Sequence, residues 1–411
     1  MTTAGFEALL KQVYGSDIKY LQPEGAMFTV DFPFSKSKGG SVGNQYVVAV
    51  VASDEQGVTY GTAADGAFAL NSAISMATLN AKVTSTQIVT SFSLDLDTMA
   101  RAMEGGVDAF KSATRLQFGN AKRTMTRRQE LMDLYGGTHQ YAGIGNAESI
   151  TGLTPTTATI NISLSTWSAG IWSGLKNAPI DLYTNVAGLP TALLNTTGAI
   201  SVTQIDITGR NLTVSGLAAD ILAIVAATAG SPFLFFRGAY GKEYTGLTGI
   251  LPVQTGTLFD INVTQNELFQ GNVFDCASSN LTLNKILGGL DLPAARGLDP
   301  DQKVTLYCNP RAMRGLVSDE AALRAYDYSY EKTAENGFRA LRFYSPNSGP
   351  VEIKPSRWVK EGIALAVAEG AITRGGACDI TMDPSDMGIR MPGFQLVWNL
   401  PSNAGIGARM Y

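Results

Sequence analysis

The pattern of apolar and polar residues divides the chain into segments with two different periods. Between Gln45 and Thr90, Val, Ile and Thr residues alternate with polar ones or run together on both sides of a glycine-rich stretch, which predicts a long β-hairpin. Between Leu94 and Tyr135, apolar residues recur at steps of three and four, which predicts one long helix ended by Gly136. Two strands alone are marginally stable in water, so the hairpin is expected to need a neighbouring surface.

The segments after this helix are predicted to be β-rich first and mixed afterwards. From Ser149 to Ile261 the chain is rich in Thr, Val, Ile and Gly, with turn signals at the spacing of short strands. The stretch "VTLYCNPRAMRGLVS" predicts a strand, Asn309 as a helix N-cap, Pro310 at the first helical position and then a helix. "SDEAALRAYDYSYEK" continues the helical pattern, and "FRALRFYSPNSGPVEIKPS" and the glycine-punctuated C-terminal stretch return to strands. The predicted fold class is therefore α+β.

The first 45 residues are predicted to form an arm that packs against another surface. A short helix is expected near its start, and an extended segment rich in Gly and Ser follows. This segment carries Phe28, Phe32 and Phe34, and a disordered tail rarely holds so many aromatic side chains. We therefore predict these three phenylalanines as intersubunit contacts.

Composition favours a chain whose surface is partly covered by other molecules. Of the 411 residues, 45% are hydrophobic and only 16% are charged, whereas globular chains average about 25% charged residues. The formal net charge of -4 gives no overall basic surface, so any contact with DNA is expected to be local or weak. The sequence starts without a signal-peptide pattern and has no apolar run long enough to span a bilayer, which predicts a soluble protein without membrane contact.

The sequence offers no pattern of residues that predicts an enzyme. Its single histidine, His139, follows two glycines and is interpreted as a surface turn residue, and one histidine excludes multi-histidine metal sites. The carboxylate pairs Asp95 with Asp97 and Asp299 with Asp301 fit a helix cap and a turn. The three cysteines, Cys276, Cys308 and Cys378, are too scattered for a disulfide framework. We predict no catalytic residues, no cofactor and no metal.

One stretch, "FLFFRGAYGKEYTGLTGI", resembles the start of a phosphate-binding loop and fails its requirements. Such a loop needs Gly, four residues and then Gly-Lys-Ser/Thr, because backbone N–H groups hold the phosphates and the hydroxyl reaches Mg²⁺. Phe236 occupies the position of the first glycine and Glu243 that of the hydroxyl. Gly241 and Lys242 are therefore interpreted as part of a turn.

The second half of the predicted long helix is strongly basic. Glu130 and Asp133 are the acidic residues there. A solvated or salt-bridged helix face is the usual explanation of such a charge run, and contact with a polyanion such as DNA is the alternative. The basic residues are Lys111, Arg115, Lys122, Arg123, Arg127 and Arg128.

The order of these segments resembles the major capsid protein of tailed bacteriophages, which has the Hong Kong ninety-seven-type fold. The phrases that carry the resemblance are "LDLDTMARAMEGGVDAFKSATRLQFGNAKRTMTRRQELMDLYGG", "YTGLTGILPVQTGTLFDI", "VTLYCNPRAMRGLVSDEAALRAYDYSY" and the stretch from "GFRALRFYSPNSGP" to "ACDITMDP". The resemblance implies an N-arm at 1–45, an E-loop hairpin at 46–93, and a peripheral domain with a spine helix at 94–150 and 351–411. It also implies an axial domain at 151–350, with a β-rich subdomain around 151–255 that matches least well and is interpreted as an insertion or a diverged part.

This resemblance implies a structural role in a virus head. Subunits would self-assemble through a procapsid into hexamers and pentamers of an icosahedral shell around double-stranded DNA, and their location would be the virion capsid. Implied partners are other copies of the chain, a separate scaffolding protein, a portal, a decoration protein and weakly bound DNA. The alternatives are an encapsulin-like shell of a cellular compartment and a phage tail or other structural protein.

Some members of this family form a covalent cross-link between an E-loop lysine and an asparagine of a neighbour. The hairpin here carries Lys82, with Lys36 and Lys38 before it, and Asn403 lies near the C-terminus. Such chemistry needs a desolvated lysine and positioned partners, which sequence does not reveal, so no cross-link is predicted. Lys82 is retained as a candidate intersubunit contact.

Overall fold

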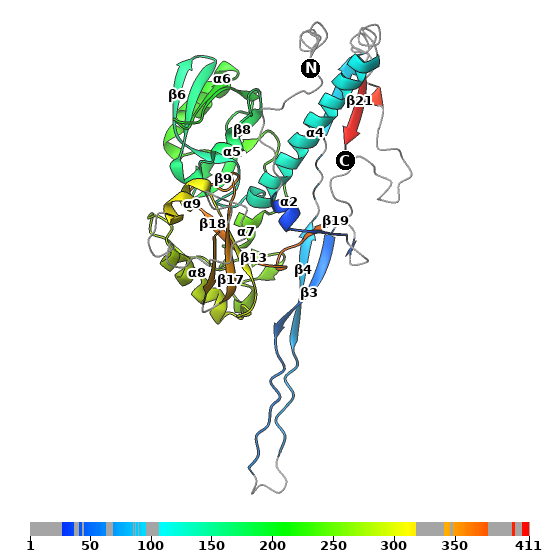
Figure 1. The fold of residues 1–411 in the computed structure, drawn as a ribbon, viewed down its shortest axis with the longest axis vertical. Helices are drawn as coiled ribbons and strands as arrows, with labels where there is room; N and C mark the ends of the chain where they lie inside the picture. Colours follow the sequence, from blue (N-terminus) through cyan, green and yellow to red (C-terminus); the bar gives the residue numbers. More distant parts are fainter. Residues whose placement is uncertain are drawn as a thin grey trace, which may run out of the picture.

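Figure 1 shows the computed structural model, which describes residues 27–36, 41–42, 45–62, 69–84, 86, 88, 90–95, 107–317, 341–345, 348–376, 397–398 and 405–410. The longest described helix is α4 (Val107–Tyr135). A β-barrel lies above an α/β domain on one side of this helix, and a narrow hairpin projects away from both (Figure 1). Within the described part of the chain, no helix is long and apolar enough to cross a membrane.

Helix α4 is the long helix that the periodic pattern predicts, but it starts later than Leu94. Leu94 and Asp95 belong to β5 (Thr90–Asp95), which pairs antiparallel with β21 (Gly405–Met410), itself paired with β20 (Val397–Trp398). This correction has a physical cause, because pairing with a distant strand outweighs local helical periodicity. The proposed cap Asp97 lies outside the described residues. The helix passes Gly119 without a break and ends at Tyr135, and Gly137 with φ of 108° turns the chain away.

The predicted β-rich segment forms a closed barrel between Gly145 and Phe236. Its sheet has the order β10-β11-β7-β6-β12-β8-β9, and a further antiparallel pairing of β10 with β8 closes six of the strands into a ring. Inward positions alternate in β7 and β11, and in β7 Ala158, Ile160 and Ile162 are fully buried. The strands are β6 (Gly145–Thr154), β7 (Thr157–Ile162), β8 (Pro179–Val186), β9 (Leu189–Leu193), β10 (Ile200–Asp206), β11 (Asn211–Ser215) and β12 (Phe233–Phe236).

Short helices accompany the barrel and lead out of it. Helix α5 (Ala169–Trp172) lies between β7 and β8, and α6 (Ala218–Ala226) between β11 and β12. After β12 the chain forms α7 (Leu247–Ile250), which contacts α4, and then the small hairpin β13 (Thr257–Leu258) and β14 (Ile261–Asn262).

In the described residues, the α/β domain is a four-stranded sheet with two helices on one face. The sheet order is β16-β17-β15-β18, with β15 parallel to β17 and the other pairs antiparallel. Leu306 and Cys308 face a separate apolar core with Leu290 of α8 and Leu316 of α9. The elements are α8 (Leu283–Ala295), β15 (Val304–Cys308), α9 (Pro310–Val317), β16 (Leu341–Ser345), β17 (Ser348–Pro355) and β18 (Ala364–Ala368).

Local signals predicted the start of α9 correctly. The side chain of Asn309 accepts a hydrogen bond of 2.9 Å from the backbone N–H of Arg311, and Pro310 is the first helical residue. The predicted division into domains stays a prediction, and two of its boundaries fall inside strands. The boundary at 150/151 falls inside β6 and the one at 350/351 falls inside β17, so residues on both sides of each boundary belong to one sheet.

The end of the predicted arm packs into the core of its own chain. Helix α2 (Phe28–Asp31) and β1 (Phe34–Lys36) lie here, and β1 pairs with β19 (Arg374–Gly376). Phe28 and Phe32 are 0% and 5% exposed, and the Phe28 ring centroid lies 4.8 Å from that of Tyr307. The interpretation of Phe28 and Phe32 as intersubunit contacts is therefore corrected, because burial in their own chain leaves them no surface for a neighbour. Phe34 is half-buried, with the Arg374 guanidinium 5.9 Å from its ring.

A buried carboxylate holds this segment against α4. Glu130 accepts hydrogen bonds from the backbone N–H groups of Met27, Phe28 and Thr29 at 3.1, 3.0 and 2.7 Å, and from the Thr29 hydroxyl at 2.6 Å. Its side chain is 0% exposed. These donors offset the cost of removing the charge from water, so the anchor depends on all of them being in place.

A second carboxylate ties the same segment to the α/β domain. Asp31 accepts hydrogen bonds from the Tyr307 hydroxyl at 2.7 Å and from Lys354 Nζ at 3.0 Å. Burial and this contact with Asp31 raise the pKa of Tyr307 well above its ordinary value, so the hydroxyl keeps its proton as a donor. The segment Met27–Lys36 therefore joins α4 to the α/β sheet.

Replacing Glu130 by Gln is expected to destabilise the protein by about 1–3 kcal/mol. One oxygen becomes an NH₂ group, which places a donor against buried N–H donors and leaves them unsatisfied. Urea denaturation of the purified chain measures the effect. The control is Glu148→Gln, at a glutamate whose side chain is 56% exposed, where a change within about 0.5 kcal/mol is expected. Equal effects of the two substitutions would contradict the anchoring role.

Candidate functional site

The projecting hairpin is the most exposed apolar feature of the described residues. Strands β3 (Gln45–Ser53) and β4 (Ala77–Thr84) pair antiparallel from Gln45 opposite Thr84 to Ser53 opposite Ala77, and a bond of 3.1 Å from Gln56 N–H to the Ile74 carbonyl continues the arm beyond them. In Figure 1 this arm extends away from the other described elements. Large apolar side chains that are 40% to 89% exposed lie along it, namely Val48, Val51, Val58, Tyr60, Leu70, Ile74 and Met76.

The base of the hairpin is held by the turn between β13 and β14. Lys82 Nζ lies 2.5 Å from Asp260 Oδ2, and the Lys82 backbone N–H donates to the Phe259 carbonyl at 2.8 Å. Phe259 and Asp260 have φ of 51° and 69°, a left-handed conformation that non-glycine residues adopt at a cost. The structure thus places Lys82 in a contact within its own chain, and its predicted role between subunits stays a prediction.

The basic face of α4 is engaged largely within the protein. Arg127 donates to the carbonyls of Gly170 and Ile171, and its guanidinium lies 5.5 Å from the Trp358 ring. Arg128 lies 3.0 Å from the centroid of the Phe236 ring. Burial lowers the pKa of Arg127 to about 10 and that of Arg128 to about 9, with the neighbouring charges of Arg127 and Glu243 as smaller influences on Arg128. These two arginines therefore serve packing between α4 and the barrel.

The other basic residues of α4 differ in position. Lys122 is exposed and Arg123 is half-buried. Arg115 and Lys111 lie on α4, but their side chains lie outside the described residues. Contact with DNA stays a prediction for this part of the helix.

A buried lysine from the loop after β17 packs against the C-terminal end of α4. Lys360 is 1% exposed, and its Nζ donates to the carbonyls of Tyr141 at 3.1 Å and Gly143 at 2.9 Å. It lies 4.1 Å from the Tyr135 ring centroid, and the Tyr135 hydroxyl accepts from the Lys360 backbone N–H at 2.8 Å. Burial lowers the pKa of Lys360 to about 7. A neutral amine still has two hydrogens, so both carbonyl bonds survive loss of the charge.

His139 is a neutral structural residue at the same end of the helix. Its Nδ1 accepts from the Tyr141 backbone N–H at 3.2 Å, so Nε2 carries the proton and donates to the Gly136 carbonyl at 3.1 Å. Burial lowers its pKa to about 4, with the nearby charge of Lys360 as a smaller cause. A Cβ on Gly249 in α7 would lie 2.4 Å from the His139 ring, so α7 can approach the ring this closely only through a glycine. The turn predicted at His139 is confirmed, and the ring packs instead of facing solvent.

The other residues considered for chemistry lie in a turn, in the core or in a loop. Asp299 Oδ1 accepts from the Asp301 backbone N–H at 3.0 Å, as the predicted turn requires. Burial raises the pKa of Cys308 to about 12, Cys276 is a free thiol, and Cys378 lies outside the described residues. Lys242 is exposed in a turn. No group of three or more potential metal ligands is present in the part of the chain that the structure describes.

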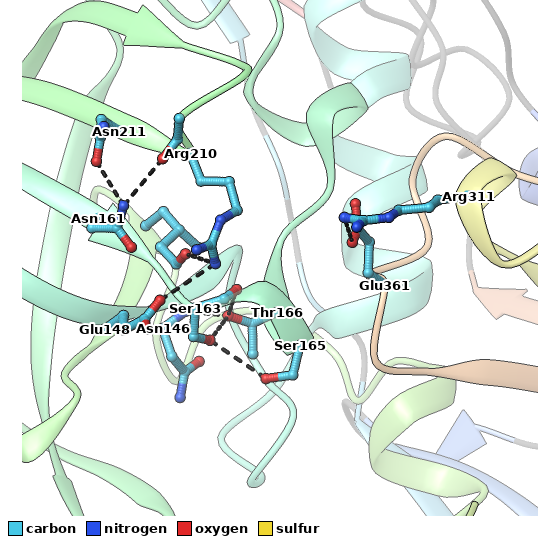
Figure 2. Close-up of polar contacts among 12 residues, drawn as sticks. Asn146, Glu148, Asn161, Ser163, Ser165, Thr166, Arg210, Asn211, Arg311 and Glu361 are labelled. Carbon is cyan, nitrogen blue, oxygen red and sulfur yellow. Dashed lines mark hydrogen bonds and ion pairs between the residues drawn. The ribbon is translucent and has the colours of Figure 1, made fainter. Parts of the chain in front are cut away.

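A basic cavity lies where the barrel meets the α/β domain, and sequence patterns did not identify it. Its volume is about 390 Å³, and its charged lining residues are Arg311, Arg314, Arg357 and Glu361. Figure 2 shows Arg311 pairing with Glu361, at 3.0 Å. Arg311 and Arg314 are three positions apart on α9 and so share a face, a signal present in the sequence. Arg357 and Glu361 follow β17, and only the folded topology brings them to α9.

The barrel side of this junction is polar but satisfied by its own contacts. Figure 2 shows Asn161 donating to Asn211 at 2.7 Å and Arg210 donating to Glu148 at 3.3 Å. Arg210 also donates to the Ile162 carbonyl at 2.8 Å. These contacts stabilise the loop before β11 and leave the charged lining of the cavity as the distinctive feature of the junction.

Comparison with known proteins assigns the chain to no family. No family model matches the chain, and no curated protein matches it. Among solved structures, a chain of the cyanophage A-1(L) capsid asymmetric unit aligns with a TM-score of 0.48 and 10% sequence identity. The alignment covers 97% of this chain and 92% of that chain. The function is therefore inferred from the chain's own residues.

Replacing Asp260 by Ala is expected to loosen the base of the hairpin without unfolding the protein. The substitution removes the carboxylate that pairs with Lys82, and exposed ion pairs contribute up to about 1 kcal/mol, or a factor of about five in local opening. Amide hydrogen exchange of peptides covering β4 is expected to rise by up to that factor. Glu267→Ala is the control, because Glu267 is an exposed glutamate shortly after this turn, whereas Asp260 is the residue that pairs with Lys82. Unchanged exchange at Lys82 would contradict the anchor.

Replacing Lys360 by Met is expected to change how stability depends on pH. The pKa of Lys360 is lower in the folded state than in the unfolded chain, so the unfolded chain binds more protons between about pH 7 and 10. The free energy of unfolding of the natural protein should therefore rise with pH there, by at most about 1.4 kcal/mol per pH unit from this group. Urea denaturation at pH 7, 8 and 9 compares the two proteins. A parallel pH profile in the variant would exclude this role for Lys360.

Proposed function

We propose that this chain is the major subunit of a closed protein shell, and specifically a major capsid protein that assembles into the head of a tailed bacteriophage. The observation that carries the proposal is the projecting hairpin, whose large apolar side chains are exposed in the isolated chain. Exposed apolar surface of this extent marks an interaction site, and a two-stranded arm is marginally stable in water by itself. Neighbouring copies that cover the arm would bury its apolar side chains and stabilise its two strands.

The rest of the chain supports a structural role. Only 16% of the residues are charged, as expected for a subunit whose surface is shared with neighbours through large, obligate interfaces. The order of arm, hairpin, long helix, β-rich segment and α/β domain is that of the family the sequence resembles. We propose that hexamers and pentamers form an icosahedral shell around double-stranded DNA, that scaffolding protein and portal are separate chains, and that the subunit is not an enzyme.

Shortening the hairpin tests the proposal directly. Ser53 and Ala77 are direct partners across the two strands, so residues 54–76 can be replaced by Asn-Gly, the preferred two-residue turn. The natural protein, expressed alone or with a scaffolding protein, is expected to form closed particles in electron microscopy. The shortened variant is expected to melt within a few degrees of the natural chain but to remain as subunits or small rings. Closed particles of normal size from the variant would refute the role of the hairpin, and an absence of particles from the natural protein under both conditions would refute the shell.

Particle contents distinguish the two kinds of shell. Packaged double-stranded DNA in particles from infected cells is expected for a virus head, whereas an encapsulin-like shell would contain protein cargo. Denaturing electrophoresis adds a separate result, since an uncross-linked shell should release single chains of 43.5 kDa.

A further inference from the structure

We propose that the basic cavity between the barrel and the α/β domain receives an acidic side chain from the hairpin of a second copy of this chain. The acidic residues are Asp54 and Glu55, directly after β3. This inference rests on the proposed function, because it names the contact by which one shell subunit binds the next.

The charge of the cavity favours an anionic occupant. Arg311, Arg314 and Arg357 line it with one carboxylate, that of Glu361. Glu361 pairs with Arg311 at 3.0 Å, so the lining as a whole keeps a net positive charge. The Arg314 side chain is exposed and has no polar partner among the described residues. A guanidinium group binds a carboxylate in a planar, two-point geometry, which suits Arg314 to this role.

The walls of the cavity are held in place before any partner arrives. Asn309 Nδ2 donates to the Val359 carbonyl at 2.7 Å, and Glu361 N–H donates to the Trp167 carbonyl at 2.9 Å. Gly362 N–H donates to the Ser165 carbonyl at 2.9 Å. These bonds join α9, the loop after β17 and the barrel. Arg311 and Glu361 are therefore presented by fixed backbone, which lowers the entropy cost of binding.

The hairpin supplies the matching charge. Asp54 and Glu55 are exposed, and the described residues provide neither with a partner. Because consecutive side chains of an extended strand point to opposite sides, one of the two can enter the cavity while the other stays at its rim. The arm points away from the barrel and the α/β domain of its own chain (Figure 1), so the contact has to form between copies.

The cavity fits a carboxylate from a protein better than the phosphates of DNA. A volume of about 390 Å³ accommodates one or two side chains. Duplex DNA is bound through many phosphates along an extended basic surface. Because Glu361 pairs with Arg311, the lining offers Arg314 to a single anionic group, which matches one carboxylate and not a row of phosphates.

A charge-exchange experiment tests this contact. Arg314→Glu is made alone, Asp54→Lys with Glu55→Lys is made as a hairpin variant, and all three substitutions are then combined. Like charges facing each other at an interface cost several kcal/mol, so each of the first two proteins is expected to give at least about tenfold fewer closed particles than the natural chain. The combined variant is expected to recover most of the yield, because the ion pair re-forms with its charges exchanged.

Matched variants control for general effects of charge. Arg237→Glu changes an exposed arginine in the loop after β12, and Glu267→Lys changes an exposed glutamate, both outside the cavity and the hairpin. Both are expected to assemble normally. Arg314→Gln removes the charge without reversing it and should give a smaller defect. Thermal melting of each subunit shows whether it folds.

Each outcome supports or overturns the contact. Normal assembly by Arg314→Glu and by the hairpin variant, with an assembling natural chain, would overturn the contact and leave the shell standing. Loss of assembly in both without recovery in the combined variant would exclude the hairpin as the occupant. Normal particles that lose DNA from Arg314→Glu alone would assign the cavity to phosphate and overturn the proposal. Failure of the natural chain to assemble would remove the proposed function and this contact together.

Discussion

The C-terminal half of α4 is the surface on which the other parts of the chain depend. Three of its polar residues contact three different regions. Glu130 accepts from the backbone of the N-terminal segment, Arg127 donates to carbonyls at α5, and Tyr135 contacts the loop that carries Lys360. A buried charge is costly unless its partners are present. Docking of the N-terminal segment, the barrel and the α/β domain onto this helix is thus expected to be mutually dependent, so that these three parts of the chain unfold together.

The hairpin, unlike α4, contacts the rest of the described chain at one end only. Its strands are held to the body at one end, through Lys82 and the strained turn at Phe259 and Asp260. Beyond that end its apolar side chains contact solvent. A fixed base and an uncovered arm are what an intersubunit connector needs, since the base sets the direction and the arm gains stability only when a neighbour covers it.

Sequence patterns predicted those features that short-range physics determines. The period of two gave the hairpin and the barrel strands, the period of three to four gave α4, and Asn309 and Pro310 marked the start of α9. Features that depend on distant partners were missed. Leu94 and Asp95 pair with β21, a strand near the other end of the chain. Phe28 packs against Tyr307, which is also distant in sequence. Neither partner is visible in the local pattern of either segment.

The arginines show why composition alone misplaces function. Arg127 and Arg128 belong to the most basic stretch of the sequence, yet they lie against carbonyls and aromatic rings between α4 and the barrel. The stretch of sequence around Arg314 is less basic than that of α4, yet Arg314 lines a cavity together with two other arginines. An arginine is available to a partner only where its own chain leaves the guanidinium without one, and that depends on which segments the fold brings together. Arg127 and Arg128 therefore contribute to packing, whereas the arginines of the cavity are brought together only by the fold.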